Sequence, residues 1–220
     1  EEPADLHLEC LEPGPAPSRL APIDLTSHLA PTADRVVDMT AFWADFDGQH
    51  LARNEVNSFD HVQSTQGAAS LMGGSLDQGY GQAWWRVAGD EALLYEVEVP
   101  NCVYWGVQLG DVWYQSLDWV NRQSSLNGHQ ASISDDGVFR AVISQRDPGI
   151  ANWLDTSGAT QGCITYRWNQ AGSSPVPILR LIPFAELEGS LDDRWIRISP
   201  GKRSDLLRIR RRGALRRFRR

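Results

Sequence analysis

The stretch ALLYEVEVPNCVYWGVQLG (92–110) decides the fold, because its apolar side chains alternate with a period of two on both sides of Pro100. Before this proline, the apolar face holds Leu93, Tyr95, Val97 and Val99, opposite Leu94, Glu96 and Glu98. After it, the apolar face holds Val103, Trp105, Val107 and Leu109, opposite Tyr104, Gly106 and Gln108. This period predicts two strands that each place one face in a core.

Three later stretches carry the same kind of pattern. ASISDDGVFRAVIS (131–144) predicts a hairpin that turns at Asp135-Asp136-Gly137. QGCITYRW (161–168) and PILRLIP (177–183) predict further strands, whereas the Gly-rich stretch 64–82 predicts a loop over the mouth of the fold. Short strands separated by turns are typical of a mainly β protein, so we expect an antiparallel jelly-roll-like β-sandwich.

The region before the strands predicts one or two N-terminal helices packed on the sandwich. Apolar residues at 3, 4 and 3 spacing form one helical stripe: Val36, Met39, Trp43 and Phe46. Asp34 and Asp38 suit the first turn of such a helix, and Gly48 is the expected C-cap. Pro31 is expected to set the helix entry or to kink an earlier turn at 25–29.

The 220 residues divide into three predicted parts: a Pro-rich extended lead-in (1–22), the sandwich domain (23–200) and a basic tail (201–220). The chain starts at Glu1 without Met, so we expect the C-terminal part of a longer protein. Cys10, Cys102 and Cys163 are odd in number and far apart, which indicates reduced thiols and a cytoplasmic location.

The net charge of −7 hides a split between an acidic body and the tail. Residues 202–220 carry Lys202 and nine Arg against Asp205, a net charge of +9, whereas the rest has 11 basic and 27 acidic residues, a net charge of −16. Ser204 could cap a tail helix with Leu207, Ala214 and Phe218 along one side. We expect this tail to be solvated or docked on the acidic body, with an anionic membrane surface for residues 203–220 as the alternative. Nucleic acid is not expected, because the acidic body offers no basic face.

Several reaction classes lack their sequence signals. No phosphate-binding loop, dinucleotide fingerprint or G-x-S-x-G turn is present. No two of the five histidines stand two or four residues apart, so we expect no metal site. The only lysine lies in the tail, which argues against Schiff-base chemistry, and no cofactor is expected.

The stretch LDWVNRQSSLNGHQ (117–130) gives the first candidate site. If residues 112–120 form a strand, Tyr114 and Asp118 share a face close to Arg122 and His129. Such a group could perform acid/base catalysis, with Asp118 orienting the imidazole of His129. The alternative is structural: Arg122 pairs with Asp118, Asn127-Gly128 forms a turn and His129 begins the next strand.

The stretch RDPGIANWLDTSG (146–158) gives the second candidate, either a rigid loop on the rim or a structural corner. Asn152 can satisfy loop backbone groups, Trp153 can anchor the loop, and Asp155 can cap it. With Asn121, these three residues and three further tryptophans predict a Trp-rich ligand pocket; the further tryptophans are Trp105, Trp113 and Trp119. Such a pocket suits a small aromatic, alicyclic or sugar-like ligand.

Four ordered blocks resemble the family called domain of unknown function 1214. They are YWGVQLGD (104–111), NRQSSLNGHQ (121–130), DGVFRAVIS (136–144) and DPGIANWLDTSG (147–158), within a match that covers about residues 75–185. The resemblance implies a jelly-roll-like sandwich and no established activity. It also implies a bacterial branch in which this domain closes a longer chain, and a companion β domain that this chain lacks.

Two functions therefore compete. The first is a metal-free small-molecule enzyme or binding protein with the Trp-rich pocket and catalytic residues Tyr114, Asp118, Arg122 and His129. The second is a non-catalytic interaction or glycan-binding module whose basic tail holds an anionic surface.

Overall fold

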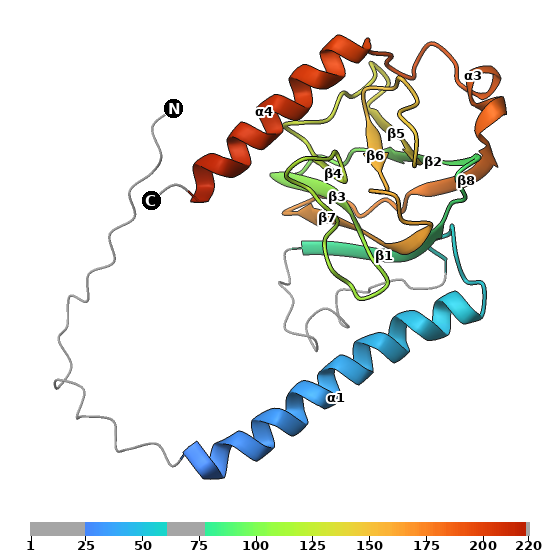
Figure 1. Cartoon of the computed structure of the whole chain (residues 1–220). Coiled ribbons are helices and arrows are strands. Elements are labelled where there is room, and N and C mark those ends of the chain that lie inside the picture. The colour runs from blue at the N-terminus through green and yellow to red at the C-terminus, as the bar shows by residue number, and fades with distance from the viewer. Residues whose placement is uncertain (1–24, 61–77, 219–220) are drawn as a thin grey trace. The chain divides into compact units, whose positions relative to one another are not determined.

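The structure is a computed structural model that describes residues 25–60 and 78–218 (Figure 1). The predicted lead-in (1–22) and most of the Gly-rich stretch therefore lie outside the described residues. The chain divides into two compact units, Glu1–Ala41 and Phe42–Arg220. In the first unit, the described residues form the N-terminal part of helix α1 (Leu25–Ala52), and the apolar side chains of Leu29, Val36, Val37 and Met39 are exposed there.

The second unit contains two four-stranded sheets packed face to face. Sheet A has the order β1-β7-β3-β4, and its strands are β1 (Gln78–Arg86), β7 (Gln161–Asn169), β3 (Tyr104–Gly110) and β4 (Ser125–Asn127). Sheet B has the order β6-β5-β2-β8, and its strands are β6 (Trp153–Asp155), β5 (Val138–Ser144), β2 (Glu91–Glu98) and β8 (Ile178–Pro183). Three helical segments follow: η1 (Phe184–Glu186), α3 (Leu187–Ser190) and α4 (Pro200–Phe218). The prediction of a β-sandwich with an N-terminal helix is confirmed at this level, but the described chain is mixed α/β rather than mainly β, because α1 and α4 are both long helices.

The prediction of a wholly antiparallel sandwich is wrong for one strand pair. β5 and β6 are parallel, with Val142 opposite Trp153 and Ser144 opposite Asp155. The chain leaves β5 at Ser144 and returns to its side at Trp153, in the same direction. The loop 145–152 is long enough for this crossover. The other strand pairs of the described chain are antiparallel.

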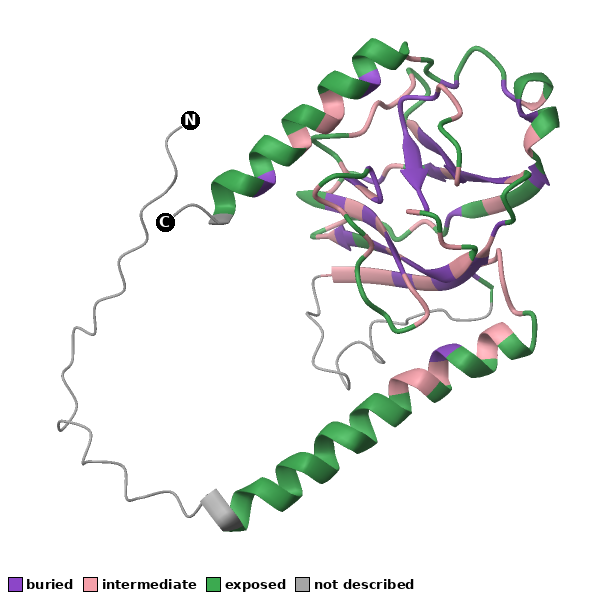
Figure 2. Ribbon diagram, viewed as in Figure 1, coloured by how far each residue is buried: buried purple, intermediate pink, exposed green. Residues whose placement is uncertain are grey.

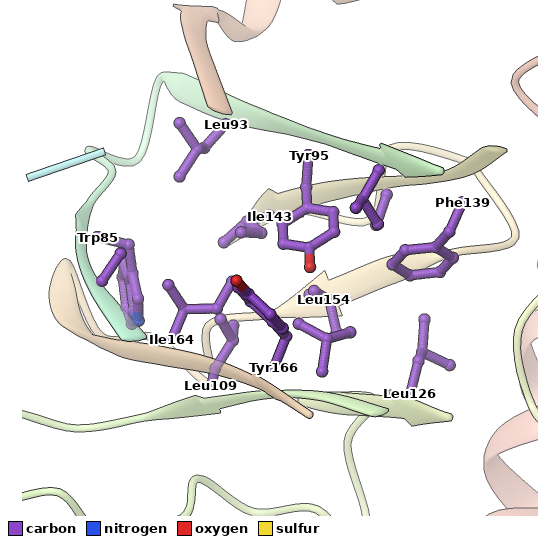
Figure 3. Close-up of a cluster of buried hydrophobic side chains, with 14 of the residues drawn as sticks. Trp85, Leu93, Tyr95, Leu109, Leu126, Phe139, Ile143, Leu154, Ile164 and Tyr166 are labelled. Carbon is purple, nitrogen blue, oxygen red and sulfur yellow. The ribbon is translucent and has the colours of Figure 1, made fainter. Parts of the chain in front are cut away.

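The alternation in residues 92–110 has the predicted consequence within the two strands, but Val103, predicted on the apolar face, precedes β3 and is exposed. Leu93, Tyr95 and Val97 of β2 and Trp105, Val107 and Leu109 of β3 belong to one core between the sheets. Figure 3 shows side chains of both sheets meeting in this layer. An aromatic contact joins the layers: the Trp105 ring lies 4.9 Å from Phe139 of sheet B, and within sheet A it lies 6.0 Å from Trp168, measured between centroids. These edge-to-face and tilted geometries are the favourable ones for aromatic pairs.

The outer faces of the two sheets differ. Leu94 and Val142 on the outer face of sheet B pack against Ile150, Leu187 and Trp195 in a second apolar cluster. Strands β2, β5 and β6 of sheet B are therefore largely buried, whereas β8 is exposed along most of its length. The outer face of sheet A instead presents Tyr104, Gly106 and Gln108 of β3, in register with Asn169, Arg167 and Thr165 of β7. Figure 2 shows this contrast in burial along the strands.

Three local predictions need correction. Helix α1 runs through Pro31 and Gly48 and ends at Ala52, and the left-handed residue after it is Asn54, with φ 57°. Residues 112–120 form turns and no strand, apart from an isolated bridge between Ser116 and Gly110. In the Gly-rich stretch, the described part (78–82) belongs to strand β1.

The expected hairpin at 131–144 forms as a turn with only one strand, because residues 131–134 pair with no neighbour as a strand. Gly137 adopts a positive φ of 77°, which favours glycine, and its N–H donates to the carbonyl of Ser134. The guanidinium of buried Arg140 donates to Asp136 and holds the pKa of that carboxyl well below its usual range.

The basic tail forms helix α4 and docks on the sandwich, which is one of the two states, solvated or docked, that the sequence predicts. Ser199 caps the helix rather than Ser204, because the Ser199 hydroxyl accepts the N–H of Lys202 and Pro200 occupies the first helical position. Arg203 is buried, donates from Nε to Asp147 at 2.9 Å and covers the Trp153 ring at 5.2 Å. Its Nη1 donates to the carbonyl of Ala151, and its Nη2 to that of Ile150. No helix in residues 25–60 or 78–218 combines the length and apolar character needed to cross a bilayer.

We predict that Gly162→Ala destabilises the sandwich, because the new Cβ would lie 2.1 Å from the carbonyl oxygen of Gly110 and 3.0 Å from the Trp85 ring. The free energy of unfolding should fall by about 2–3 kcal/mol in urea titrations followed by Trp fluorescence. Gly189→Ala is the matched control, because its Cβ would meet nothing within 4 Å. Equal unfolding midpoints for the two variants would contradict the close approach of β7 to β3.

We predict that Arg203→Ala lowers the free energy of unfolding by about 2–4 kcal/mol, because it removes the donor to the Ile150 carbonyl and one of the two donors to the Ala151 carbonyl, and it breaks the pair with Asp147. Arg211→Ala, at an exposed position of the same helix, should change it by less than about 0.5 kcal/mol. Denaturant unfolding of both variants tests this prediction. An unchanged free energy of unfolding for Arg203→Ala would contradict the role of Arg203 in docking α4.

Candidate functional site

The predicted acid/base group does not assemble around His129. Asp118 accepts the backbone N–H of Asn121 at 3.0 Å and its side-chain amide at 3.1–3.2 Å, and the backbone hydrogen bond is the main reason that the pKa of Asp118 is lowered. The imidazole of His129 is exposed and has no hydrogen-bond or ion-pair partner in residues 25–60 and 78–218. The structure therefore gives no support to an Asp118–His129 pair.

The other two proposed catalytic side chains have separate partners. Tyr114 stacks on Trp43 with ring centroids 5.1 Å apart and donates its hydroxyl to Gln82 at 2.9 Å. Burial raises the pKa of Tyr114 to about 12, which keeps this phenol protonated at neutral pH. Arg122 pairs with buried Asp155 at 3.0 Å instead of with Asp118.

The structure brings the two stretches chosen from the sequence side by side. Besides the Arg122–Asp155 pair, the buried amide of Gln123 donates to the carbonyls of Ala151 and Trp153 at 2.9 and 2.7 Å. Asn152 is buried and joins the segment before β5 to β5 itself, donating to the carbonyls of Ser132 and Arg140. These contacts satisfy backbone groups, so they support the structural-corner alternative for residues 146–158. Gln123 was missed by sequence reasoning, because a single glutamine gives no signal of burial.

The four tryptophans of the predicted pocket are dispersed. Trp105 is in the core, and buried Trp153 donates its indole N–H to the carbonyl of Ser144. Trp113 is 60 % exposed. Trp119 is half-buried, and its carbonyl accepts a hydrogen bond from Arg210 of α4. None of the four lines the hollow described next.

A shallow hollow of about 90 Å³ lies on the free part of the outer face of sheet A. Its walls come from β3, β4, β7 and the turn after β4: Tyr104, Gly106, Val107, Gln108, Ser125, Leu126, Asn127, Gln130 and Arg167. Gly106 lies between Asn127 and Arg167 in the register of the sheet. A Cβ on Gly106 would lie 3.0 Å from the phenolic oxygen of Tyr104, so the absent side chain leaves room for the Tyr104 ring over β3. We call these residues the β3–β4 hollow.

The chemistry of the β3–β4 hollow is that of recognition. Its side chains offer a phenol, a hydroxyl, three amides and one guanidinium, without a carboxylate or imidazole among them. Small-molecule pockets measure about 300–1,000 Å³, so this hollow could receive one functional group of a larger ligand. Arg210 of α4 borders it, donating to the Ser125 carbonyl at 2.5 Å and to the Gln130 side chain at 3.4 Å.

A second group of titratable side chains surrounds Trp84 of β1. The indole N–H of fully buried Trp84 donates to Oδ1 of Asp47 at 2.9 Å, and His50 stacks on the same indole at 3.9 Å. Oδ2 of Asp47 is buried without a hydrogen-bond partner among the described residues, and burial raises the pKa of this carboxyl. Phe46 also packs on Trp84, which shows that this cluster anchors the end of α1 and is filled by its own side chains.

The described residues, 25–60 and 78–218, bring no three His, Cys, Asp or Glu side chains together as a metal ion would require. The thiols of Cys102 and Cys163 are free. Burial is the main reason that the pKa of Cys163 rises to about 12, which makes this thiol a poor nucleophile.

Comparison with known proteins finds structural relatives without an assigned activity. No protein-family model matches the chain, and no curated protein matches it. An uncharacterised protein from Burkholderia cenocepacia has a similar crystal structure, with 33% sequence identity, a TM-score of 0.69 and coverage of 77% of this chain. The chain spans only 46% of the length of that protein. The VPA0106 protein from Vibrio parahaemolyticus is 14% identical over 61% of this chain and 42% of its own length, and its TM-score of 0.42 supports no argument.

We predict that Asp47→Asn stabilises the protein at pH 7. The raised pKa of Asp47 means that the fold favours the neutral carboxyl, so ionisation above that pKa lowers stability, and asparagine avoids this loss while its Oδ1 still accepts from Trp84. The gain should shrink as the pH falls towards 4, where the wild-type carboxyl becomes protonated. Urea midpoints at pH 7 and pH 4 measure it, with Asp45→Asn, exposed on the same helix, as the control. A pH-independent difference would contradict burial of the charge.

Proposed function

We propose that this chain is a non-catalytic binding module that recognises a polar, sugar-like ligand with the β3–β4 hollow. One observation carries the proposal. On an uncovered part of sheet A, the half-exposed ring of Tyr104 lies beside Gly106, and the side chains around them carry amide and hydroxyl groups.

Sugars need this combination of groups. A pyranose has hydroxyls that both donate and accept hydrogen bonds, which the amides of Gln108, Asn127 and Gln130 can match from the described walls. It also has an apolar ring face that an aromatic side chain can cover. Tyr104 is 49 % exposed at the hollow, so its phenol ring has area available for such a contact.

Binding is favoured over acid/base catalysis because the β3–β4 hollow offers no group suited to moving a proton at neutral pH. Its walls contain no carboxylate and no imidazole, the side chains that most often transfer protons in catalysis. Asp118 and His129, which were predicted to fill this role, do not line the hollow.

The wider biological setting is also a proposal. We propose that the chain is part of a longer bacterial protein related to the domain of unknown function 1214 family, jelly-roll-like in topology, cytoplasmic and accompanied by another β domain. The 33% identity to a Burkholderia protein of about twice the matched length supports the relation to longer bacterial proteins. Neither relative's name states a ligand.

The test is a glycan array probed with the 220-residue chain, followed by calorimetric titration of the best oligosaccharide. We predict that Tyr104→Ala weakens binding about 3- to 10-fold, because it removes the aromatic wall. Val103→Ala is the matched control, since Val103 is exposed, precedes the same strand and does not line the hollow. Equal affinities of the two variants, or an array without binding above background, would contradict the proposal.

A further inference from the structure

We infer that the ligand of the β3–β4 hollow carries a carboxylate, held between Arg167 of β7 and Arg210 of α4. This inference rests on the proposed function, because it specifies which sugar-like ligands the hollow prefers: acidic sugars over neutral ones of the same ring.

Arg210 is a half-buried cation that has only neutral partners among the described residues. Its Nη1 donates to the Trp119 carbonyl at 3.2 Å and to the Ser125 hydroxyl at 3.4 Å, while its Nη2 donates to the Ser125 carbonyl and to the Gln130 amide oxygen. Burial lowers the pKa of Arg210, which reports the cost of holding this charge away from water. No carboxylate in residues 25–60 or 78–218 lies within ion-pair distance to offset that cost.

Three other arginines that are buried or contact loops each form an ion pair with a carboxylate. Arg140 pairs with Asp136 and Glu96, Arg203 pairs with Asp147, and Arg122 pairs with Asp155. Unpaired burial of a charge is costly, so this pairing is the expected pattern.

Arg86 is the instructive exception. It too lacks a carboxylate partner, but its Nη2 donates to the carbonyl of Leu51 in the last turn of α1. The dipole of a helix favours a positive charge at that end, so Arg86 has a compensating partner built into the fold. Arg210 contacts no helix terminus through its hydrogen bonds, so the same explanation does not apply to it.

Arg167 adds a second cation to the same hollow. It is in register with Gly106, lines the hollow and is exposed. Its guanidinium lies 5.7 Å from the centroid of the Tyr80 ring, and it has no ion-pair partner among the described residues. The body of this protein is strongly acidic, so a hollow bordered by two guanidiniums and lined by no carboxylate departs from the average surface.

A purely structural role for Arg210 explains only part of these observations. Its hydrogen bond to the Ser125 carbonyl covers the free edge of the short strand β4, which protects that edge. A neutral glutamine could also donate to this carbonyl, however, so edge protection does not require a charge. It also gives no account of Arg167, which belongs to a strand in the interior of the sheet.

A carboxylate group matches the site in size and chemistry. Guanidiniums bind carboxylates through charge-assisted hydrogen bonds that are stronger than neutral ones. Arg167 can supply a pair of such donors, whereas the Nη groups of Arg210 already donate to four acceptors, so Arg210 contributes mainly its charge. The small volume of the hollow admits a single group of this kind, while the rest of a sugar ring can lie against Tyr104 and the amides.

The test titrates the ¹⁵N-labelled 220-residue chain with D-glucuronate, D-glucose and acetate at low ionic strength, followed by NMR chemical shifts. Glucuronate should bind about tenfold more tightly than glucose, and this preference should fall as salt is added. Arg167→Gln and Arg210→Gln should each remove most of the preference. Arg180→Gln is the matched control, because Arg180 is exposed on β8 of the other sheet.

The outcomes separate the inference from the function on which it rests. Equal binding of glucuronate and glucose would overturn the acidic-ligand inference and leave the sugar-binding function intact. A second outcome is that acetate and glucuronate bind with equal affinity, that this binding depends on Arg167, and that glucose does not bind. This outcome would support the carboxylate site and overturn the sugar-binding function. If none of the three binds, or if Arg180→Gln has the same effect as Arg167→Gln, the inference is overturned.

Discussion

The packing of aromatic side chains between the two sheets is the constraint on which the rest of this structure depends. Trp105 of sheet A meets Phe139 of sheet B and also packs on Trp168 of its own sheet, while Tyr95 of β2 contacts Phe139. Successive side chains of a strand point to opposite faces, so an inward Trp105 forces its neighbours Tyr104 and Gly106 outwards. The core therefore determines which residues are available to form the β3–β4 hollow.

The two sheets use their outer faces differently because the chain after β8 covers only one of them. Apolar side chains from η1 to Trp195 pack on sheet B and bury most of β2 and β5. On sheet A, the last turns of α1 cover Trp84 of β1, and the loop after β3 contributes Tyr114, whose hydroxyl binds Gln82. The part that stays uncovered is formed by β7, β3 and β4, and its side chains are polar as a solvated sheet face requires.

The sequence predicted which faces of β2 and β3 point inwards, because local periodicity determines them. It did not predict the register between distant strands, because no local pattern reports it. The alternation in residues 92–110 correctly assigned the inward and outward residues of β2 and β3. The first residues of β1 (78–82) were predicted as loop because of their glycines, yet a Cβ on Gly81 would lie 2.0 Å from the Tyr166 ring across the sheet. The pairing of Gly106 with Arg167 joins residues 61 positions apart, and no local pattern reports such a register. Asp118 and His129 are close in sequence, but Asp118 accepts hydrogen bonds from Asn121 and the side chain of His129 is exposed.

The position of Arg210 connects the hollow with the docking of α4. Arg203 fixes one end of the helix through an ion pair that the fold itself completes, whereas Arg210 brings its charge to β4 with neutral acceptors only. Desolvation of Arg210 therefore opposes docking, while its hydrogen bonds and the burial of Ala214 favour it. An anion bound in the hollow would interact with Arg210 only in the docked state, so by thermodynamic linkage it would stabilise the docked helix as much as the docked helix strengthens its binding. On this proposal the arginine-rich helix would form part of the binding surface, held there by Arg203 and Arg210.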